Sequence, residues 1–353
     1  MKHLYTTHPN PRVCTVPSAG TTASRTPANS SRPSQDASPP APTVWGSSTT
    51  NVSHRDISPA EPCPSCGKRF IDEVCADIYR VMAGEGDLAG TEPLAAVGTP
   101  LIHPGFAMRL APYLPPGSLI LLSKKVGERA AGRLVAEVPE VRGVVRAGAG
   151  TPGIADTDAE PATHTLLAGC DVRADIFPTR AGPVVVYKQQ SALHVEFPRD
   201  HNAKILTLER EIGRRRPRTF VDACSGAGTL GLAAARAGIH HVVCNDAWYA
   251  AASWAACNLQ VNREFLDIGE VTVHRSYDDL RHHPVARDPV LVATAAGAQE
   301  IEVYQGDLRL FDAVLLPGVD LAALDLFEKK DAEKVGLITA AWLARVGGDI
   351  FIP

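Results

Sequence analysis

The chain has 353 residues, of which 45% are hydrophobic and 21% charged, and its formal net charge at pH 7 is −4. A chain of this length usually forms two or three domains, and its acidic balance argues against a strongly cationic coat for nucleic acid, although a local basic face is compatible with it. No apolar run reaches the roughly 18 to 20 residues that a bilayer-spanning helix needs, and the first residues lack the apolar core of a secretory signal, so we expect a cytoplasmic protein without a membrane partner.

Residues 1–58 are rich in small and polar side chains. Ser, Thr, Pro, Gly and Asn make up 29 of the first 50 residues, and Tyr5 and Trp45 are the only aromatic residues among them. Such a segment cannot bury enough apolar surface to offset the entropy of ordering it. We expect disorder over residues 1–58, with a targeting peptide, or non-native residues added by an upstream start codon, as alternatives.

Residues 59–190 mix short helices and short strands. Apolar residues recur at helical spacing over 70–81, and a second helix is predicted over 126–135. The small, polar stretch 151–162 indicates a loop or a hairpin tip. Strands are predicted at 119–122, 141–145, 164–167, 172–176 and 184–187. We therefore expect a small α+β domain over 59–190, which presents the substrate.

From residue 203 onward, strands and helices alternate. Helices are predicted over 203–214, 230–237, 247–262 and 332–346. Strands are predicted over 219–223, 241–244, 271–274, 313–316 and 349–352, with a hairpin inserted over 289–306. Alternation with short links implies a parallel sheet covered on both faces. The fold class predicted for residues 191–353 is α/β, a Rossmann-like doubly wound sheet whose first strand is central and opens its loop at the carboxyl edge.

A glycine-rich turn follows the strand predicted at 219–223. Gly226, Gly228 and Gly231 fit the G-x-G-x-x-G pattern of dinucleotide-binding turns, in which the backbone approaches a pyrophosphate at a helix N-terminus. Asp222 ends the strand before this turn, where it would repel a pyrophosphate. A carboxylate there suits a ligand with a cationic end, such as the amino-acid moiety and sulfonium of S-adenosylmethionine. In the alternative, the glycines only pack a helix against a strand.

A second acid ends the next predicted strand. Asn245 and Asp246 come there, Asp246 lying 18 residues after Gly228, where a carboxylate can accept both ribose hydroxyls. Because NAD sites place an acid similarly, the pair of acids at two strand ends, and not Asp246 alone, favours S-adenosylmethionine. Trp248, on the following helix, is placed to stack near an adenine. In the alternative, Asp246 only caps that helix.

These residues resemble the class I S-adenosylmethionine-dependent methyltransferases, and within them most closely the archaeal and eukaryotic tRNA guanine-N1-methyltransferases and their wybutosine-pathway relatives. The motif residues are Asp222, Gly226, Gly228, Asn245, Asp246, Asn258 and Asn262. The resemblance covers about residues 195–317 and extends more loosely upstream. It implies a class I methyltransferase fold and S-adenosylmethionine as cofactor. The predicted cofactor-binding residues are Asp222, Gly226, Gly228, Asn245, Asp246 and Asp278.

The resemblance also implies residues that place the methyl acceptor. The family holds its target base with an arginine after an aromatic-x-Pro turn, and Arg199 matches that position, with a surface salt bridge to Asp200 or Glu209 as the alternative. The family's Asn-Leu-Pro motif after the fourth strand corresponds to Leu315-Leu316-Pro317. Pro317 therefore matches, whereas Leu315 cannot form the side-chain hydrogen bonds of an asparagine.

Methyl transfer needs an acceptor atom held in line and a group that removes its proton. Candidate bases on the carboxyl edge are Asp278 or Asp279, Asp307 and Asp320, each of which is alternatively a solvated loop carboxylate. In this class, acids after the third strand commonly contact the adenine amino group. We assign Asp278 to the cofactor and predict Arg199, Pro317 and Asp307 as catalytic residues.

Two further features carry weaker predictions. Cys63 and Cys66 have the spacing of a zinc knuckle, with Cys75 nearby, but a second pair of ligands is missing, so no metal site is predicted. Zinc with His54 or His103 as a distant ligand is the alternative. The basic cluster at 214–218 either stabilises a helix C-terminus or contacts RNA phosphates.

The predicted function is S-adenosylmethionine-dependent methyl transfer to RNA, most simply to a tRNA base, with no DNA partner and no prediction of the oligomeric state. The alternatives are transfer to a protein side chain or small molecule, which the net charge and Leu315 favour, and a non-catalytic binding module. An NAD oxidoreductase is disfavoured by Asp222. Class I domains normally continue past the fifth strand, whereas this chain ends at Pro353. We therefore expect a five-stranded variant or a C-terminally truncated domain.

Overall fold

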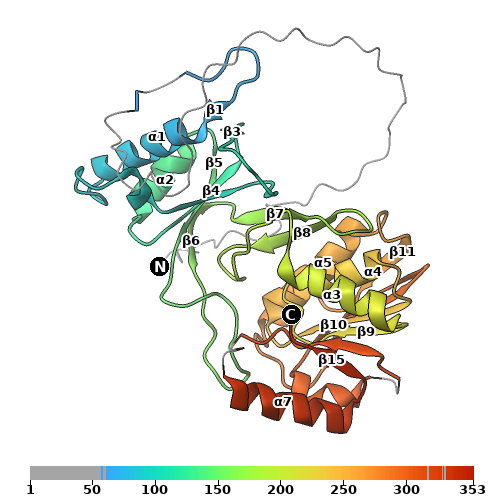
Figure 1. The fold of residues 1–353 in the computed structure, drawn as a ribbon. Helices are drawn as coiled ribbons and strands as arrows, with labels where there is room; N and C mark the ends of the chain where they lie inside the picture. Colours follow the sequence, from blue (N-terminus) through green and yellow to red (C-terminus); the bar gives the residue numbers. More distant parts are fainter. Residues whose placement is uncertain (1–56, 59–60, 316–317, 328, 330) are drawn as a thin grey trace, which may run out of the picture.

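The computed structural model describes residues 57–58, 61–315, 318–327, 329 and 331–353. Two units follow each other along the chain, a smaller one in blue and green and a larger one in yellow to red (Figure 1). The disorder predicted for 1–58 lies outside the described residues except at positions 57 and 58. No helix among the described residues is long and apolar enough to cross a membrane.

The smaller unit is an α+β layer structure, as predicted. Its four-stranded sheet has the order β2-β4-β5-β6. Its elements are β1 (Arg69–Phe70), α1 (Ile71–Gly84), η4 (Leu94–Val97), β2 (Thr99–Ile102), β3 (Tyr113–Leu114), β4 (Leu119–Ser123), α2 (Glu128–Glu137), β5 (Val141–Arg146) and β6 (Thr165–Gly169). α1 forms because Val74 and Ile78, one turn apart, are both fully buried. α2 connects the parallel pair β4 and β5.

A hairpin of β7 (Val172–Phe177) and β8 (Val184–Gln189) lies between the two units (Figure 1). Its apolar residues Phe177, Val184 and Val186 belong to the core of the larger unit. The hairpin therefore packs with that unit, although the sequence-based boundary at 190 falls after it. Short strands of this kind look like the preceding α+β elements, and the hairpin's partners are more than 70 residues further along the chain.

The larger unit is built on a seven-stranded sheet with the order β11-β12-β13-β10-β9-β14-β15. The strands are β9 (Thr219–Asp222), β10 (His241–Asp246), β11 (Ile268–Val273), β12 (Val290–Gly297), β13 (Glu300–Gln305), β14 (Leu321–Ala323) and β15 (Asp349–Phe351). The helices are α3 (Ala203–Arg215), α4 (Thr229–Arg236), α5 (Tyr249–Asn262), the short α6 (Tyr277–Arg281) and η5 (Leu308–Ala313), and α7 (Ala332–Arg345). Five strands, from β13 to β15 in this order, run parallel, and β12 and β11 are antiparallel at one edge.

Both faces of this sheet are buried, which confirms the predicted doubly wound fold. Phe220 of β9 packs in the core with α3, α4 and α5, whereas its neighbour Val221 packs in the core with η5 and α7. The same alternation separates Val242 from Val243 on β10. Two apolar faces on one strand require a helical layer on each side of the sheet.

The strand predicted at 313–316 is wrong. Its first residue ends the 3-10 helix η5, and the fourth parallel strand is β14, with Leu321, Ala322 and Ala323 paired to β9. Local preference pointed to the wrong segment because Val314 has a higher strand propensity than the Leu and Ala residues of β14. The strand predicted at 271–274 exists as β11, but it is an antiparallel edge strand. The third parallel strand is instead β13, the second arm of the predicted hairpin.

Candidate functional site

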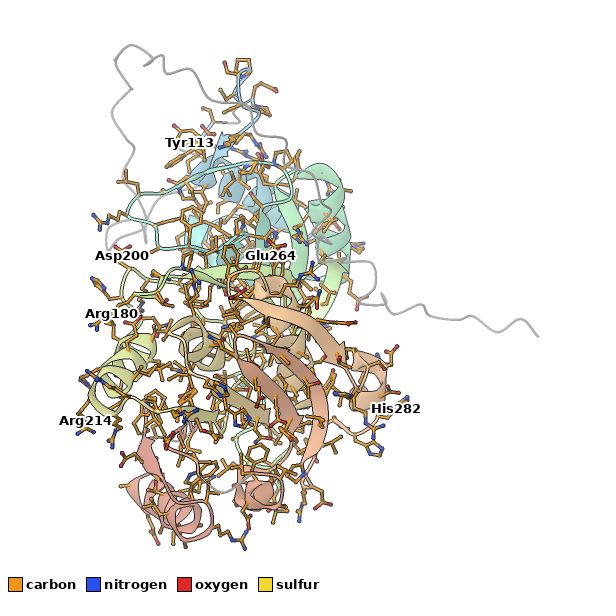
Figure 2. The ribbon with its side chains drawn as sticks, turned by 90° about the vertical axis from the view of Figure 1, so that its right-hand side faces the viewer. Tyr113, Arg180, Asp200, Arg214, Glu264 and His282 are labelled. Carbon is orange, nitrogen blue, oxygen red and sulfur yellow. The ribbon has the colours of Figure 1, made fainter. Side chains whose placement is uncertain are left out.

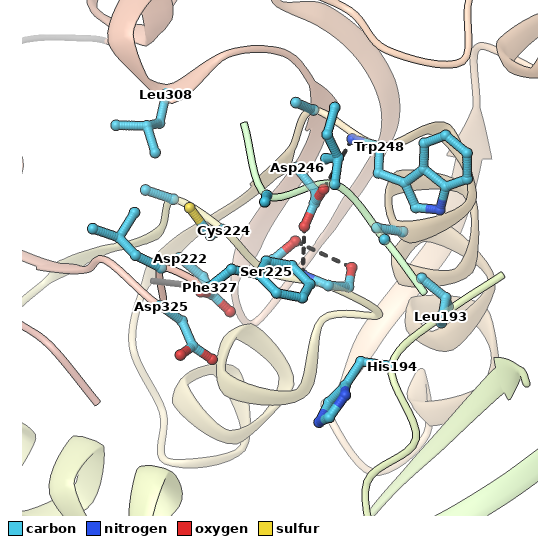
Figure 3. Close-up of a pocket in the computed structure, with 18 of the residues that line it drawn as sticks. Leu193, His194, Asp222, Cys224, Ser225, Asp246, Trp248, Leu308, Asp325 and Phe327 are labelled. Atoms are coloured by element: carbon cyan, nitrogen blue, oxygen red, sulfur yellow. Dashed lines mark hydrogen bonds between the residues drawn. The ribbon is translucent and has the colours of Figure 1, made fainter. Parts of the chain in front are cut away.

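A cavity of about 470 Å³ opens at the carboxyl ends of β9, β10, β13 and β14 (Figure 3). It is lined by the glycine turn after β9, the start of α5 and the residues that follow β13 and β14. Residues 151–157, in the loop between β5 and β6 of the smaller unit, form a further wall of the cavity. Figure 1 shows this loop extending from the smaller unit to α7. We call residues 151–157 the strap.

The glycine turn brings the start of α4 close to the sheet. Gly228 precedes α4 with a φ of 87°, a left-handed conformation that disfavours other residues. A Cβ atom at Gly231 would lie 2.2 Å from the Sγ of Cys244 on β10, so only glycine allows this approach of helix to strand. Gly226 lines the cavity, whereas Gly228 does not. The turn thereby directs the first backbone N–H groups of α4 towards the end of β9.

Asp222 is buried at the end of β9, with 1% of its surface exposed. Its Oδ2 accepts a hydrogen bond from the N–H of Gly231 (3.1 Å), while no described group bonds its Oδ1. Burial raises the pKa of Asp222 to about 8, and the nearby charge of Asp325 adds to this effect. In the free protein Asp222 is therefore largely protonated at neutral pH, with one oxygen available to a ligand.

Asp246 ends the neighbouring strand, β10, on the same cavity. Its Oδ2 accepts from the N–H of Gly226 (2.9 Å) and its Oδ1 from the N–H of Trp248 (2.9 Å), as the dashed lines of Figure 3 show. Burial raises the pKa of Asp246 to about 6, although these two N–H groups oppose the shift. Each oxygen keeps a lone pair for a further donor. The indole of Trp248 donates to the carbonyl of Ala192 (2.9 Å), which fixes the ring against the cavity.

These hydrogen bonds determine which charge the glycine turn can bind. A pyrophosphate at such a turn needs free backbone N–H groups. Here the N–H of Gly226 donates to Asp246 and the N–H of Gly231 donates to Asp222. The carboxyl groups of Asp222 and Asp246 therefore occupy the positions where a phosphate would accept, and the turn favours a neutral or cationic group.

Asp307 follows β13 and connects the cavity to the strap. It caps η5, forms an ion pair with Arg309 (2.6 Å) and accepts from the hydroxyl of Thr157 (2.7 Å). Burial opposes ionisation, but these partners outweigh it and lower the pKa of Asp307. The strap is held further by Asp156, which pairs with Arg309 (3.0 Å) and Lys334 (3.1 Å). Asp307 is thus a fixed anion and is unsuited to accept a proton.

The other end of the cavity carries charged groups that the sequence analysis did not single out. Asp325 follows β14 and pairs with Lys204 (2.5 Å) and Lys329 (2.5 Å), and Lys188 of β8 pairs with Glu196 (2.9 Å). Asp325 was missed because β14 was placed at 313–316; an acid directly after the short apolar run 321–324 was the available signal. The other pairs join residues of separate elements and leave no local pattern.

Several predicted residues do not line the cavity. Asn245 is fully buried, and its Nδ2 donates to the carbonyls of Ala223 (3.1 Å) and Gly306 (2.9 Å), so it ties three segments together behind the site. Asp278 is exposed on α6 because the strand before it, β11, is an edge strand and not the third parallel strand. The structure therefore brings neither Asn245 nor Asp278 to the cavity wall.

The predicted acceptor residues are also rearranged. Arg199 is exposed and does not line the cavity, and the described residues include no ion pair for it. Pro317 lies outside the described residues. Leu315 follows η5 and packs in the apolar cluster that includes Phe311, Leu324 and Trp342. The candidate base Asp320 accepts from two backbone N–H groups near the start of β9 and is likewise distant from the carboxyl edge.

Asn258 and Asn262 of the family motif have a structural role here. Each side-chain amide pairs with the backbone of one residue on β8, accepting from its N–H and donating to its carbonyl. The residues so paired are Tyr187, by Asn258, and Val185, by Asn262. α5 thereby binds the edge of the hairpin as another strand would. In the described part of the chain, no group of three or more potential ligands is arranged for a metal ion.

The parallel strand order β13-β10-β9-β14-β15, the glycine turn after β9 and the acids that end β9 and β10 belong to a Rossmann-like, doubly wound α/β fold with one cavity at its carboxyl edge. No protein-family model matches the chain, and no curated protein matches it. Several solved structures match the chain at low sequence identity.

Trm1 from Pyrococcus horikoshii with S-adenosyl-L-methionine is 16% identical with a TM-score of 0.32; the match covers 49% of this chain and 40% of Trm1. TYW2 from P. horikoshii in complex with MeSAdo is 14% identical with a TM-score of 0.37, covering 70% of this chain and 69% of TYW2. The tRNA (uracil-54, C5)-methyltransferase of P. abyssi in complex with S-adenosyl-L-homocysteine is 13% identical with a TM-score of 0.35. The match covers 75% of this chain and 53% of that protein. Similarities this distant do not carry an activity from one protein to another.

Proposed function

We propose that this protein is an S-adenosylmethionine-dependent methyltransferase. The observation that carries the proposal is the pair of carboxylates, Asp222 and Asp246, which end adjacent strands and flank one glycine turn in one cavity. Asp246 accepts the two ribose hydroxyls, and Trp248 packs against the adenine side. Asp222 receives the cationic amino-acid end through its free Oδ1. The bound cofactor supplies an activated methyl group on a sulfonium.

The cavity fits such a ligand in size and charge. Its volume of about 470 Å³ lies within the usual range for small-molecule sites. A buried carboxyl oxygen without a hydrogen-bond partner is costly, and a ligand ammonium group would satisfy it. NAD is a poor fit because its pyrophosphate would meet the two carboxylates that already occupy the N–H groups of the turn.

We propose further that the acceptor is RNA, most simply a tRNA base. Arg216 and Arg218 are exposed between α3 and the start of β9, at the opposite end of that strand from the cavity, where only an extended substrate could contact both. No ion pair holds either arginine among the described residues. Glu196 lines the cavity, and Phe197 and Arg199, which follow it in the chain, are exposed to solvent. Free guanidinium groups bind phosphates, and an exposed aromatic ring near the site can stack on a base.

A protein side chain or a small molecule is the second candidate acceptor. It is favoured by the net charge of −4 and by the pairing of Arg214 and Arg215 with Glu211, which neutralises part of the basic cluster. Figure 2 shows Arg214 and Arg180 on the same side of the molecule as Asp200, so acids and bases share this surface.

The cofactor proposal is tested by thermal denaturation. S-adenosylmethionine and S-adenosylhomocysteine should raise the Tm, because a ligand that binds only the folded state stabilises it, whereas NAD should leave the Tm unchanged. Asp246→Ala should lose most of the shift. Asp278→Ala, an exposed acid outside the cavity, is the matched control and should keep it. Equal stabilisation by NAD would reject the assignment.

A further inference from the structure

The cavity contains a titratable side chain that is exposed and unpaired. His194 lines the cavity and lies at the edge of the side chains drawn around it in Figure 3. Its imidazole forms no hydrogen bond or ion pair with any residue that the structure describes. An imidazole at this position can contact a molecule that enters from solvent.

The other titratable groups of the cavity are already engaged or protonated. Among the described lining residues, each carboxyl or cationic group other than His194 has a hydrogen-bond or ion-pair partner within the protein. These groups are Asp156, Lys188, Glu196, Lys204, Asp222, Asp246, Asp307, Arg309, Asp325, Lys329 and Lys334. Burial raises the pKa of the Cys224 thiol well above its usual value, so it stays protonated.

We propose that His194 is the general base that removes the proton from the methyl acceptor. This inference rests on the proposed methyl transfer and specifies its acceptor as an N–H or O–H group. The acceptor nitrogen or oxygen forms a bond to the methyl carbon as the carbon–sulfur bond breaks, and sulfur keeps the electron pair as a neutral thioether. The acceptor's proton passes to the unprotonated ring nitrogen of His194, and the exposed imidazolium releases it to water.

The surroundings of His194 favour the neutral ring that a base requires. Although part of the side chain is open to solvent, desolvation by the neighbouring residues lowers the pKa of His194 below its usual 6.5, and the positive charges of Lys188 and Lys204 add to this effect. The nearby acids Glu196 and Asp325 act in the opposite direction without reversing the shift. Glu196 cannot replace His194 as base: burial alone would raise its pKa, but Lys188 and Asn202 lower it to about 2. At pH 7 His194 is the neutral member of this group.

The first test compares variants in methyl transfer from labelled S-adenosylmethionine to bulk tRNA from cells that lack the gene. His194→Gln should lower kcat/KM about 100-fold or more, the usual contribution of a general base. At saturating S-adenosylmethionine, where ionisation of Asp222 no longer limits cofactor binding, the variant should also lose the fall in activity at acidic pH. Added imidazole should partly restore His194→Ala. His201→Gln, an exposed histidine outside the cavity, is the control and should match the unmodified protein.

Two readouts do not depend on turnover. S-adenosylhomocysteine should raise the Tm of His194→Gln as much as that of the unmodified protein, which separates a missing base from a lost cofactor site. An NMR titration should give His194 a pKa below 6.5. The proposal is overturned if His194→Gln keeps its rate and pH profile, or if His194 is protonated at pH 7. If the unmodified protein gains no stability from S-adenosylhomocysteine, the proposed function itself fails.

Discussion

The buried carboxyl group of Asp222 favours binding of a cationic ligand when it is ionised, but the same charge destabilises the folded chain when no ligand is bound. Its folded-state pKa of about 8 lies far above the ordinary value of 3.8 because burial disfavours the charged form. Between these values the folded chain binds a proton that the unfolded chain has lost. The free energy of unfolding therefore contains a contribution from Asp222 that falls as the pH rises from about 4 to about 8.

Asp222→Asn should remove this dependence. At pH 8.5 the variant should be more stable than the unmodified protein by up to about 5 kcal/mol, because an amide carries no charge to bury and each pKa unit corresponds to about 1.4 kcal/mol. At pH 4 the two should be nearly equal. Urea denaturation at the two pH values measures the difference. Asp278→Asn is the exposed control and should change neither value. A variant that is less stable at pH 8.5 would show that the carboxylate is satisfied in the free protein.

At the scale of elements, the strap is the segment whose position depends on contacts with the other unit. Asp156 pairs with Arg309 and Lys334, and the hydroxyl of Thr157 donates to Asp307. A Cβ atom at Gly153 would lie 2.9 Å from the ring of Phe327, so the strap also packs closely on the residues after β14. The contacts are partly exposed and individually weak, so a ligand in the cavity should add to the stability of the strap.

Limited proteolysis tests this expectation. S-adenosylhomocysteine should slow cleavage within residues 151–157, and Asp156→Ala should speed cleavage of the free protein because two ion pairs are lost. Asp158→Ala, which removes the more exposed pair with Arg287, should have little effect. If neither the ligand nor Asp156→Ala changes the cleavage rate, the strap is not coupled to ligand binding in the cavity.

The elements also show what sequence reasoning can reach. Long segments with a clear helical period, such as α1 and α3, are predicted within a few residues because their apolar faces are local properties. β14 was missed because its three residues become a strand only by pairing with β9, a contact across about 100 residues. The edge position of β11 is likewise set by its partner β12 and not by its own sequence.

The candidate site was predictable in part for the same reason. Asp222, Gly226 and Asp246 line one cavity because strand ends and a glycine turn are visible in the sequence, while their roles towards a cofactor stay predictions. Asp325 and His194 reach the cavity through the positions of β14 and the segment after β8, which the sequence alone does not define. Asn245 looked equivalent to Asp246 but lies behind the site, because neighbouring residues of a strand point to opposite faces.

At the scale of the whole molecule, the question is whether RNA binds near the exposed arginines. Binding to a polyanion should weaken steeply with salt, and replacing Arg216 and Arg218 by Gln should reduce the slope of log K against log salt by about 1 to 2. Replacing Arg214 and Arg215 is the matched control and should change the slope less, because both already pair with Glu211. Filter binding of tRNA at several salt concentrations measures the slopes. Absence of salt-dependent binding would move a protein side chain or a small molecule to first place as acceptor.

The central claim is that the cavity holds a ligand with a cationic amino-acid end and a ribose. Isothermal titration calorimetry of S-adenosylhomocysteine with the full chain tests it most directly. Binding should be saturable and tighter at pH 8 than at pH 6, because the ligand's ammonium group requires ionised Asp222, whose pKa in the free protein is about 8. Asp222→Asn and Asp246→Ala should each lose about 1 to 3 kcal/mol of binding free energy. Asp222→Asn should also lose most of the pH dependence, with a small remainder from Asp246, whose pKa is about 6. Absence of binding, or equal affinity in both variants at both pH values, would contradict the account.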